Sequence, residues 1–97
     1  MNQTIITAIQ NRSILEFTYE GHHRVVEPHS YGLSASRKEV IRCYQIGGSS
    51  VANSVPSWKI MDVDQIVGLF VTSRHFVRPR AGYRKGDRRL SAIFCEI

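Results

Sequence analysis

The chain has 97 residues, enough for one domain with a single core, and its 42% hydrophobic and 22% charged side chains exclude disorder throughout. The formal net charge is +5 at pH 7, which favours anionic partners, although the same charge also serves simply to keep a small protein in solution. No apolar run reaches transmembrane length, and the first residues lack the basic and apolar regions of a signal peptide. We therefore expect a cytoplasmic protein without a membrane partner.

A short helix is predicted over residues 2–12. Asn2 or Thr4 has the side-chain oxygen needed to cap its first turn. Ile5 and Ile9 recur at helical spacing and form an apolar stripe. A helix this short persists only when it is docked, so we expect it to lie across an open end of a sheet.

A β-hairpin is predicted over residues 14–31. Leu15 and Phe17 alternate with polar residues, and this period of two indicates a strand with one buried face. Gly21 provides the turn because glycine readily adopts a positive φ. Pro28 has no N–H to donate, so the second strand is expected to lie at an edge or to end there.

Three further strands are predicted at residues 39–46, 57–62 and 66–72, and the last is apolar enough to be central. Between the first two lies a stretch rich in Gly and Ser, residues 47–56, which predicts a long flexible loop. Short strands that each have one apolar face are typical of a small, strongly bent barrel. We therefore expect a mainly β domain with an N-terminal helix and a β-barrel of about five strands over residues 14–72.

The remaining segment, residues 73–97, is a basic C-terminal extension. Between residues 74 and 89 there are seven Lys or Arg residues and one acid, Asp87, with Phe76 and Tyr83 among them. Such a segment can follow a nucleic-acid backbone. Alternatively, the two aromatic side chains pin a solvated tail to the barrel, and the two interpretations are compatible. Residues 90–97 alternate in a way that fits either a strand or a helical turn.

Arg42 and Tyr44 are expected to project from one face of the same strand. An arginine beside an aromatic ring can contact a phosphate while the ring stacks on a base. Arg24 and Lys59 would complete an anion site if they lie on neighbouring strands of that face. The alternative is a solvated strand face with one packed tyrosine. Trp58 is either a core residue at the barrel mouth or a stacking platform.

Metal and catalytic sites are not expected. His22 and His23 are adjacent on a strand and therefore point to opposite faces, and no carboxylate or cysteine pattern completes a ligand set. The Gly-Gly-Ser-Ser stretch lacks the lysine of a phosphate-binding P-loop. Cys43 and Cys95 have apolar neighbours, which is typical of small buried hydrophobic residues. We expect a protein that is not an enzyme and has no cofactor.

Motifs over nearly the whole chain resemble the WYL domain family. Those of its first half are Leu15-Glu16-Phe17-Thr18-Tyr19, Arg24-Val25-Val26-Glu27-Pro28-His29 and Tyr31-Gly32. Those of its second half are Tyr44-Gln45, Trp58-Lys59 and Asp64-Gln65-Ile66. The tail of short stand-alone members resembles Phe76 with Pro79-Arg80-Ala81-Gly82-Tyr83.

The resemblance implies an Sm-like or SH3-like β-barrel that serves as a regulatory, ligand-sensing module in bacteria or phages. Members are associated with transcription regulation, DNA-damage responses and phage defence, usually beside a helix-turn-helix domain. This chain has no such segment, so the resemblance implies a separate DNA-binding partner protein. The residues expected to meet the ligand are Arg24, Arg42, Tyr44, Lys59, Trp58, Tyr31, His29, Arg80 and Arg84.

Two functional hypotheses follow. The first is a non-enzymatic module that binds nucleic acid, with single strands favoured, or a nucleotide-like anion. The second is a protein-interaction or homo-oligomerisation module that pairs through a terminal strand at residues 92–97 and does not bind nucleic acid. Salt separates them, because phosphate binding weakens steeply as salt is added and apolar strand pairing does not.

Overall fold

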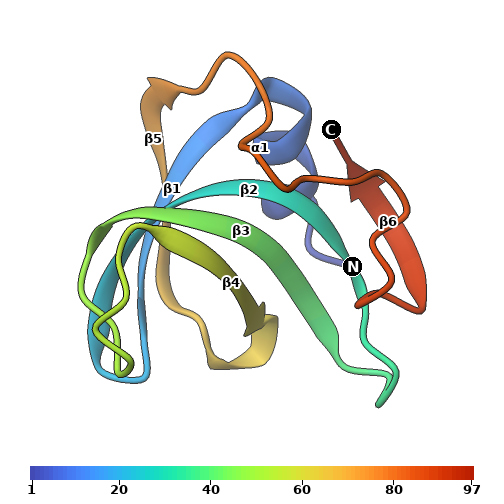
Figure 1. Cartoon of the computed structure of the whole chain (residues 1–97), viewed down its shortest axis with the longest axis horizontal. Helices are drawn as coiled ribbons and strands as arrows, with labels where there is room; N and C mark the ends of the chain where they lie inside the picture. The colour runs from blue at the N-terminus through green and yellow to red at the C-terminus, as the bar shows by residue number, and fades with distance from the viewer.

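The computed structural model describes residues 1–97 as one antiparallel sheet with a helix at its N-terminal end (Figure 1). The elements are the helix α1 (Gln3–Asn11), the strands β1 (Ser13–Tyr19), β2 (His22–Leu33), β3 (Glu39–Gly48) and β4 (Ser57–Asp62), the 3-10 turn η1 (Val63–Gln65), and the strands β5 (Val67–His75) and β6 (Ala92–Glu96). The expected mainly β fold with an N-terminal helix is confirmed. No helix is both long and apolar enough to cross a membrane.

The sheet is organised around β2. The strands follow the order β4-β3-β2-β1-β5, and β6 also pairs with β2. The first part of β2 pairs with β1 as far as Val26, and its last part pairs with β6 from Ser30 onward. β2 therefore changes its neighbour on one side while β3 runs along the other (Figure 1). The sheet is strongly curved and has six strands where about five were expected.

Pro28 lies in the middle of β2, and the expectation that it marks an edge or an end was wrong. It is opposite Cys43 of β3, and the register of that pair shifts between Pro28 and Ser30. On the other side of β2, the last pair with β1 is at Val26 and the first pair with β6 is at Ser30. Proline is tolerated in a strand at such an irregularity, where the regular ladder of hydrogen bonds is interrupted.

β5 stands at one end of the strand order and pairs only with β1, so the expectation that it is central was also wrong. Two of its apolar side chains are largely exposed, Val67 at 65% and Phe70 at 60%. Gly68 has φ of +67°, and the pairing of β5 with β1 contains register shifts. A short apolar run does not by itself distinguish a central strand from an edge strand that leaves apolar side chains uncovered.

α1 confirms the predicted helix and closes one end of the core. The side-chain oxygen of Asn2 accepts a hydrogen bond from the N–H of Ile5 at 3.1 Å, which caps the first turn. Ile5 and Ile9 are fully buried with Phe17 in the same apolar cluster. Burial of a side chain of this size contributes about 1.5–3 kcal/mol, which anchors a helix too short to persist alone.

The sequence left open whether the C-terminal residues form a strand or a helical turn. In the structure they form a strand. β6 pairs with the end of β2, and the chain between β5 and β6 crosses the outside of the sheet (Figure 1). Cys95 of β6 is half-buried and Cys43 of β3 is fully buried, and both are free thiols. Burial raises the pKa of Cys43 to about 12.

Candidate anion-binding surface

Residues 76–89, here called the C-terminal segment, dock on the outer face of the sheet, which we define by Glu27, His29, Tyr44 and Trp58. Phe76 at its start is buried and stacks on the His29 ring with centroids 5.1 Å apart. The indole N–H of Trp58 donates to the carbonyl of Ala81 at 2.9 Å. The segment is thus tied to the sheet by both apolar and polar contacts.

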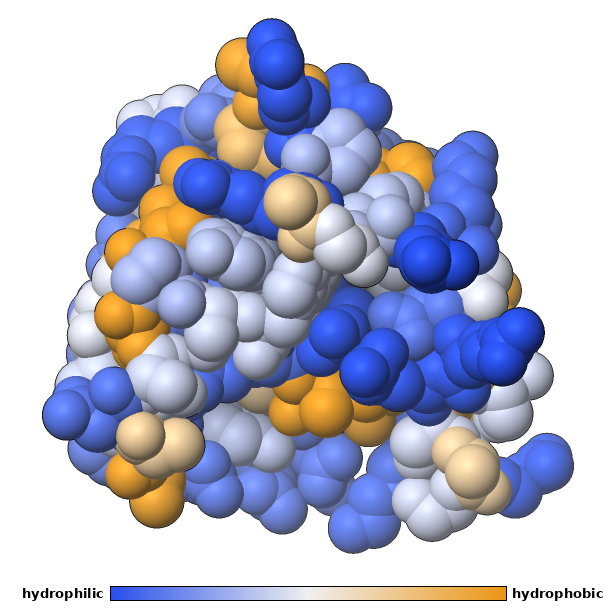
Figure 2. Space-filling model, viewed as in Figure 1, coloured by the Kyte–Doolittle hydropathy of each residue, from blue (hydrophilic) through white to orange (hydrophobic).

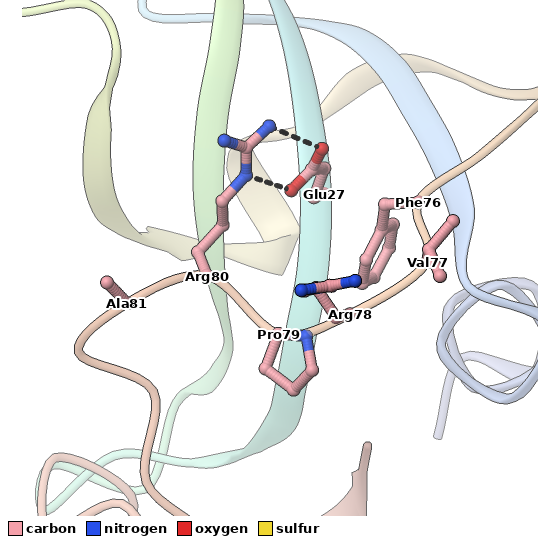
Figure 3. A pocket seen from close by; sticks show the side chains of 7 residues that line it. All are labelled: Glu27, Phe76, Val77, Arg78, Pro79, Arg80 and Ala81. Atoms are coloured by element: carbon pink, nitrogen blue, oxygen red, sulfur yellow. Dashed lines mark hydrogen bonds and ion pairs between the residues drawn. The ribbon is translucent and has the colours of Figure 1, made fainter.

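Arg80 is the central ionic contact of this docking (Figure 3). Its guanidinium donates to both carboxylate oxygens of Glu27, at 2.7 and 3.0 Å. Glu27 is only 3% exposed, so its charge depends on this partner. The hydrogen bond to Glu27 raises the pKa of Arg80. The guanidinium also lies over the Tyr44 ring, 4.9 Å from its centroid.

His29 connects Glu27 and Arg80 through the backbone. Its Nε2 accepts the backbone N–H of Arg80 at 3.1 Å, and an N–H can only donate. The proton of the neutral ring therefore resides on Nδ1, which donates to the carbonyl of Glu27 at 2.8 Å. Burial lowers the pKa of His29, which favours this neutral form.

Arg42 makes the second ionic contact between sheet and segment. Its Nε lies 3.3 Å from a carboxylate oxygen of Asp87, and the two side chains are only 13% and 10% exposed. Its guanidinium lies over the Trp58 ring, 4.9 Å from the centroid. Burial, and then the nearby charge of Arg89, lower the pKa of Arg42.

The two pairs of residues expected to form one anion site lie on opposite faces of the sheet. Tyr44 pairs with Trp58 on the outer face. Lys59 is opposite Cys43, and Arg24 is opposite Phe17, and both of these partners belong to the buried core. Because neighbouring residues of a strand alternate between faces, Lys59 and Arg24 lie on the inner face.

Besides His29, which is fully buried and stacks on Phe76 of the C-terminal segment, two of the predicted site residues are held inside the protein. Arg24 is 2% exposed and donates to the carbonyl of Tyr19 and the side-chain oxygen of Gln45. The Tyr31 ring is fully buried, and its hydroxyl donates to Glu39. Neither side chain is positioned on the outer face to meet a large ligand there.

The two aromatic rings that were expected to stack on bases, those of Tyr44 and Trp58, each have an arginine side chain of the same protein over them. Arg80 lies over Tyr44, and Arg42 lies over Trp58. The two rings themselves meet edge to face, with centroids 5.5 Å apart. Trp58 is half-buried on the outer face, so it is not a core residue, and Arg42 covers one side of the ring that was expected to be a half-exposed stacking platform.

Three cations without a carboxylate partner, Arg84, Lys85 and Arg88, gather in one loop of the C-terminal segment. A hollow of about 490 Å³ lies within this loop, here called the basic loop, and has no apolar lining. Its lining residues are Gly82, Arg84, Lys85, Gly86, Asp87, Arg88 and Arg89. Figure 2 shows strongly hydrophilic side chains gathered over this part of the chain, at the right of the view.

The basic loop is held in a fixed shape at several points. The Tyr83 hydroxyl donates to the carbonyl of Ile97 at 2.5 Å, and the N–H of Gly86 donates to the Glu96 carboxylate at 3.0 Å. Asp87, the only acid of the loop, accepts the N–H of Arg89 at 2.9 Å and turns its carboxylate toward the sheet. Arg89 also lies 3.6 Å from the Asp87 carboxylate, whereas Arg84, Lys85 and Arg88 line the hollow without a carboxylate partner.

The sequence identified Arg84 in this loop but missed Lys85, Arg88 and Arg89. The high density of basic residues between positions 74 and 89 could have pointed to these three residues as well. What the sequence could not show is that Arg80 pairs with Glu27 of β2, more than fifty positions earlier in the chain, while its neighbours stay unpaired. The separation of paired and free cations depends on tertiary contacts.

No group of three or more His, Cys, Asp or Glu side chains lies close enough together to hold a metal ion. No family model, no curated protein and no solved structure matches the chain.

Proposed function

We propose that this protein is a non-enzymatic nucleic-acid-binding module that contacts phosphates through the basic loop. The observation that carries the proposal is the arrangement of charge in that loop. Its one carboxylate, Asp87, is paired with Arg42 and Arg89, while Arg84, Lys85 and Arg88 line an open hollow without apolar lining. Cations that lack carboxylate partners are available to replace the counterions of a phosphate backbone.

The chemistry of the hollow favours backbone over base recognition. Sequence-tolerant binding to single strands normally uses free aromatic rings as stacking platforms. Here Tyr44 and Trp58 already have arginines over them, and the hollow is lined by no aromatic side chain. The module is therefore expected to bind through charge, with less preference for single strands than the sequence alone suggested.

The resemblance to WYL domains supports the same class of ligand. We propose that the curved sheet is a variant of the Sm-like or SH3-like barrel of that family, and that a separate DNA-binding protein is its partner in regulation. The resemblance implies that the ligand binds the face of the sheet that carries His29 and Arg42. In this chain the C-terminal segment covers that face. The basic loop would then take over phosphate contact from the covered face.

Fluorescence anisotropy tests the proposal directly. Labelled single-stranded DNA, duplex DNA and single-stranded RNA are titrated with the protein at low and moderate salt. We expect binding to all three that weakens steeply with salt, and a loss of about tenfold or more in affinity when Arg84 and Lys85 are both replaced by Gln. Arg37→Gln/Lys38→Gln, in the exposed turn between β2 and β3, removes the same two charges; it is the matched control and should change affinity little.

Absence of binding at low salt would refute the nucleic-acid proposal, and so would equal losses for the loop variant and for Arg37→Gln/Lys38→Gln. The second outcome would mean that only net charge matters and that no site exists.

A second candidate, self-association, is favoured by one specific observation. Val67 and Phe70 are largely exposed on β5, whose second edge is unpaired. Such an edge can pair with a strand of another chain. Sedimentation equilibrium of the protein and of Phe70→Ser tests it: a dimer that dissociates in the variant and is indifferent to salt would support this candidate, and a monomer at all concentrations would refute it.

A further inference from the structure

A second, smaller hollow lies on the inner face of the sheet, apart from the basic loop. It has a volume of about 210 Å³ and lies between the tip of the β1–β2 hairpin, the loop after β3, and β4. It is lined by Tyr19, Glu20, Arg24, Ser50, Val51, Ala52, Lys59, Ile60 and Met61. We propose that this hollow binds a small organic oxyanion, a phosphate monoester or a carboxylate with a short apolar group.

The hydrogen bonds around Lys59 leave a surplus of donors. Its ammonium donates to the Ser54 hydroxyl at 3.1 Å and, more weakly, to the Ser50 hydroxyl at 3.5 Å. The Ser50 oxygen also accepts the N–H of Ser54 at 3.3 Å. Both hydroxyls thus act as acceptors, and no protein group accepts either of their hydrogens. An ammonium has three N–H groups, so one of those on Lys59 is also left over.

The charges around the hollow also favour an anion. Lys59 forms no ion pair, whereas Arg24 pairs with Glu20 at 3.4 Å. Two cations therefore face one carboxylate. Arg24 makes four hydrogen bonds with Tyr19, Gln45 and Glu20, which leaves one of its N–H groups unused at a side chain that is 2% exposed. A buried cation with an unused donor next to an unpaired ammonium is stabilised by an oxyanion.

Size and lining define the class of ligand. Pockets for drug-sized molecules occupy roughly 300–1,000 Å³, and this hollow is smaller. A polymer or a whole nucleotide is therefore a poor fit, whereas a single charged group with a few carbon atoms is a good one. Ala52 and Met61 provide an apolar wall for those carbons. The donors of Lys59, Ser50 and Arg24 would bind the oxygens.

The site is tested by amide chemical shifts of the full ¹⁵N-labelled chain at constant ionic strength. The probes are inorganic phosphate, propyl phosphate and butyrate, each exchanged against chloride. We expect saturable shifts concentrated at Ser50, Ser54 and Lys59, and larger shifts for an organic ion than for inorganic phosphate. Saturation by propyl phosphate alone would assign a phosphate monoester, and saturation by butyrate alone would assign a carboxylate. Saturation by both would assign a general oxyanion site.

Variants separate this site from simple charge screening. Lys59→Met keeps the length of the side chain and should abolish the saturable shifts. Ser50→Ala should weaken binding about tenfold and serves as the second variant if Lys59→Met does not fold. Lys38→Met, in an exposed turn, should leave binding unchanged. Shifts that do not saturate, that chloride reproduces, or that persist in both site variants would overturn the proposal.

The outcome is independent of the proposed nucleic-acid function. Lys59 lies on the inner face and the basic loop docks on the outer face. Lys59→Met should therefore leave the affinity for single-stranded DNA unchanged. A parallel loss of DNA affinity in this variant would show that the two hollows are one site and would overturn the assignment of a separate one.

Discussion

The outer face of the sheet and the basic loop use the same residue type for different purposes. Arg80 of the C-terminal segment is held against the sheet by the Glu27 carboxylate of β2, and Arg42 of β3 holds the Asp87 carboxylate of the basic loop. Arg84 and Arg88, only a few positions along the chain, have no carboxylate partner. The role of an arginine in this segment is therefore decided by which acid lies within reach, and not by the local density of positive charge.

The largest expected effect on stability comes from Arg80→Ala. The substitution leaves the Glu27 carboxylate buried without its bidentate partner and removes the guanidinium from the Tyr44 ring. We expect the free energy of unfolding to fall by about 3 kcal/mol, measured by urea denaturation. Arg78→Ala is the control, because Arg78 is exposed and unpaired, and it should change stability by less than about 0.5 kcal/mol. Equal effects of the two substitutions would contradict the structural role of Arg80.

A smaller effect is expected from the contact between Arg42 and Asp87. Both side chains are nearly buried, so removal of one leaves the other charge poorly solvated. In a double-mutant cycle with Arg42→Gln and Asp87→Asn, we expect a favourable coupling energy of about 1–2 kcal/mol. A coupling energy near zero in urea denaturation would mean that the basic loop is not anchored by this pair.

The pH dependence of stability tests the hydrogen bonds of His29. Burial lowers the pKa of His29 below its usual 6.5, so the unfolded chain takes up this proton at a higher pH than the folded chain does. The contribution of His29 is complete above about pH 6.5 and is lost as the pH falls below that value, because a protonated Nε2 cannot accept the N–H of Arg80. We expect denaturation curves at pH 7.5 and 5.5 to differ more for the wild-type protein than for His29→Gln. The same difference in both proteins would refute this assignment.

Local elements of the fold were predictable because their signals lie in neighbouring residues. The Asn2 cap, the stripe of Ile5 and Ile9, and the alternation around Phe17 each determine structure within a few positions. β5 was misjudged because its apolar run does not reveal that one side has no neighbouring strand. Pro28 was misjudged because β2 changes partners at that point, which is a property of the whole sheet.

The candidate site shows the same limit. The sequence correctly placed Arg42 with Tyr44 on one face of β3, because alternation along a strand is local. It could not place Lys59 on the opposite face, because the register between β3 and β4 depends on the length and path of the intervening loop. Nor could the sequence show that the Arg80 guanidinium would lie over the Tyr44 ring.

The most direct test of the division between paired and free cations is the salt dependence of single-stranded DNA binding. Affinity is measured by anisotropy from low to moderate salt for the wild-type protein and for Arg84→Gln/Arg88→Gln, after urea denaturation has shown equal stability. If each of these arginines neutralises one phosphate, the slope of log K against log salt should become shallower by about 1.4, roughly 0.7 for each phosphate that is no longer neutralised. An unchanged slope in a stably folded variant would contradict the claim that the free cations of the basic loop are the ones that bind.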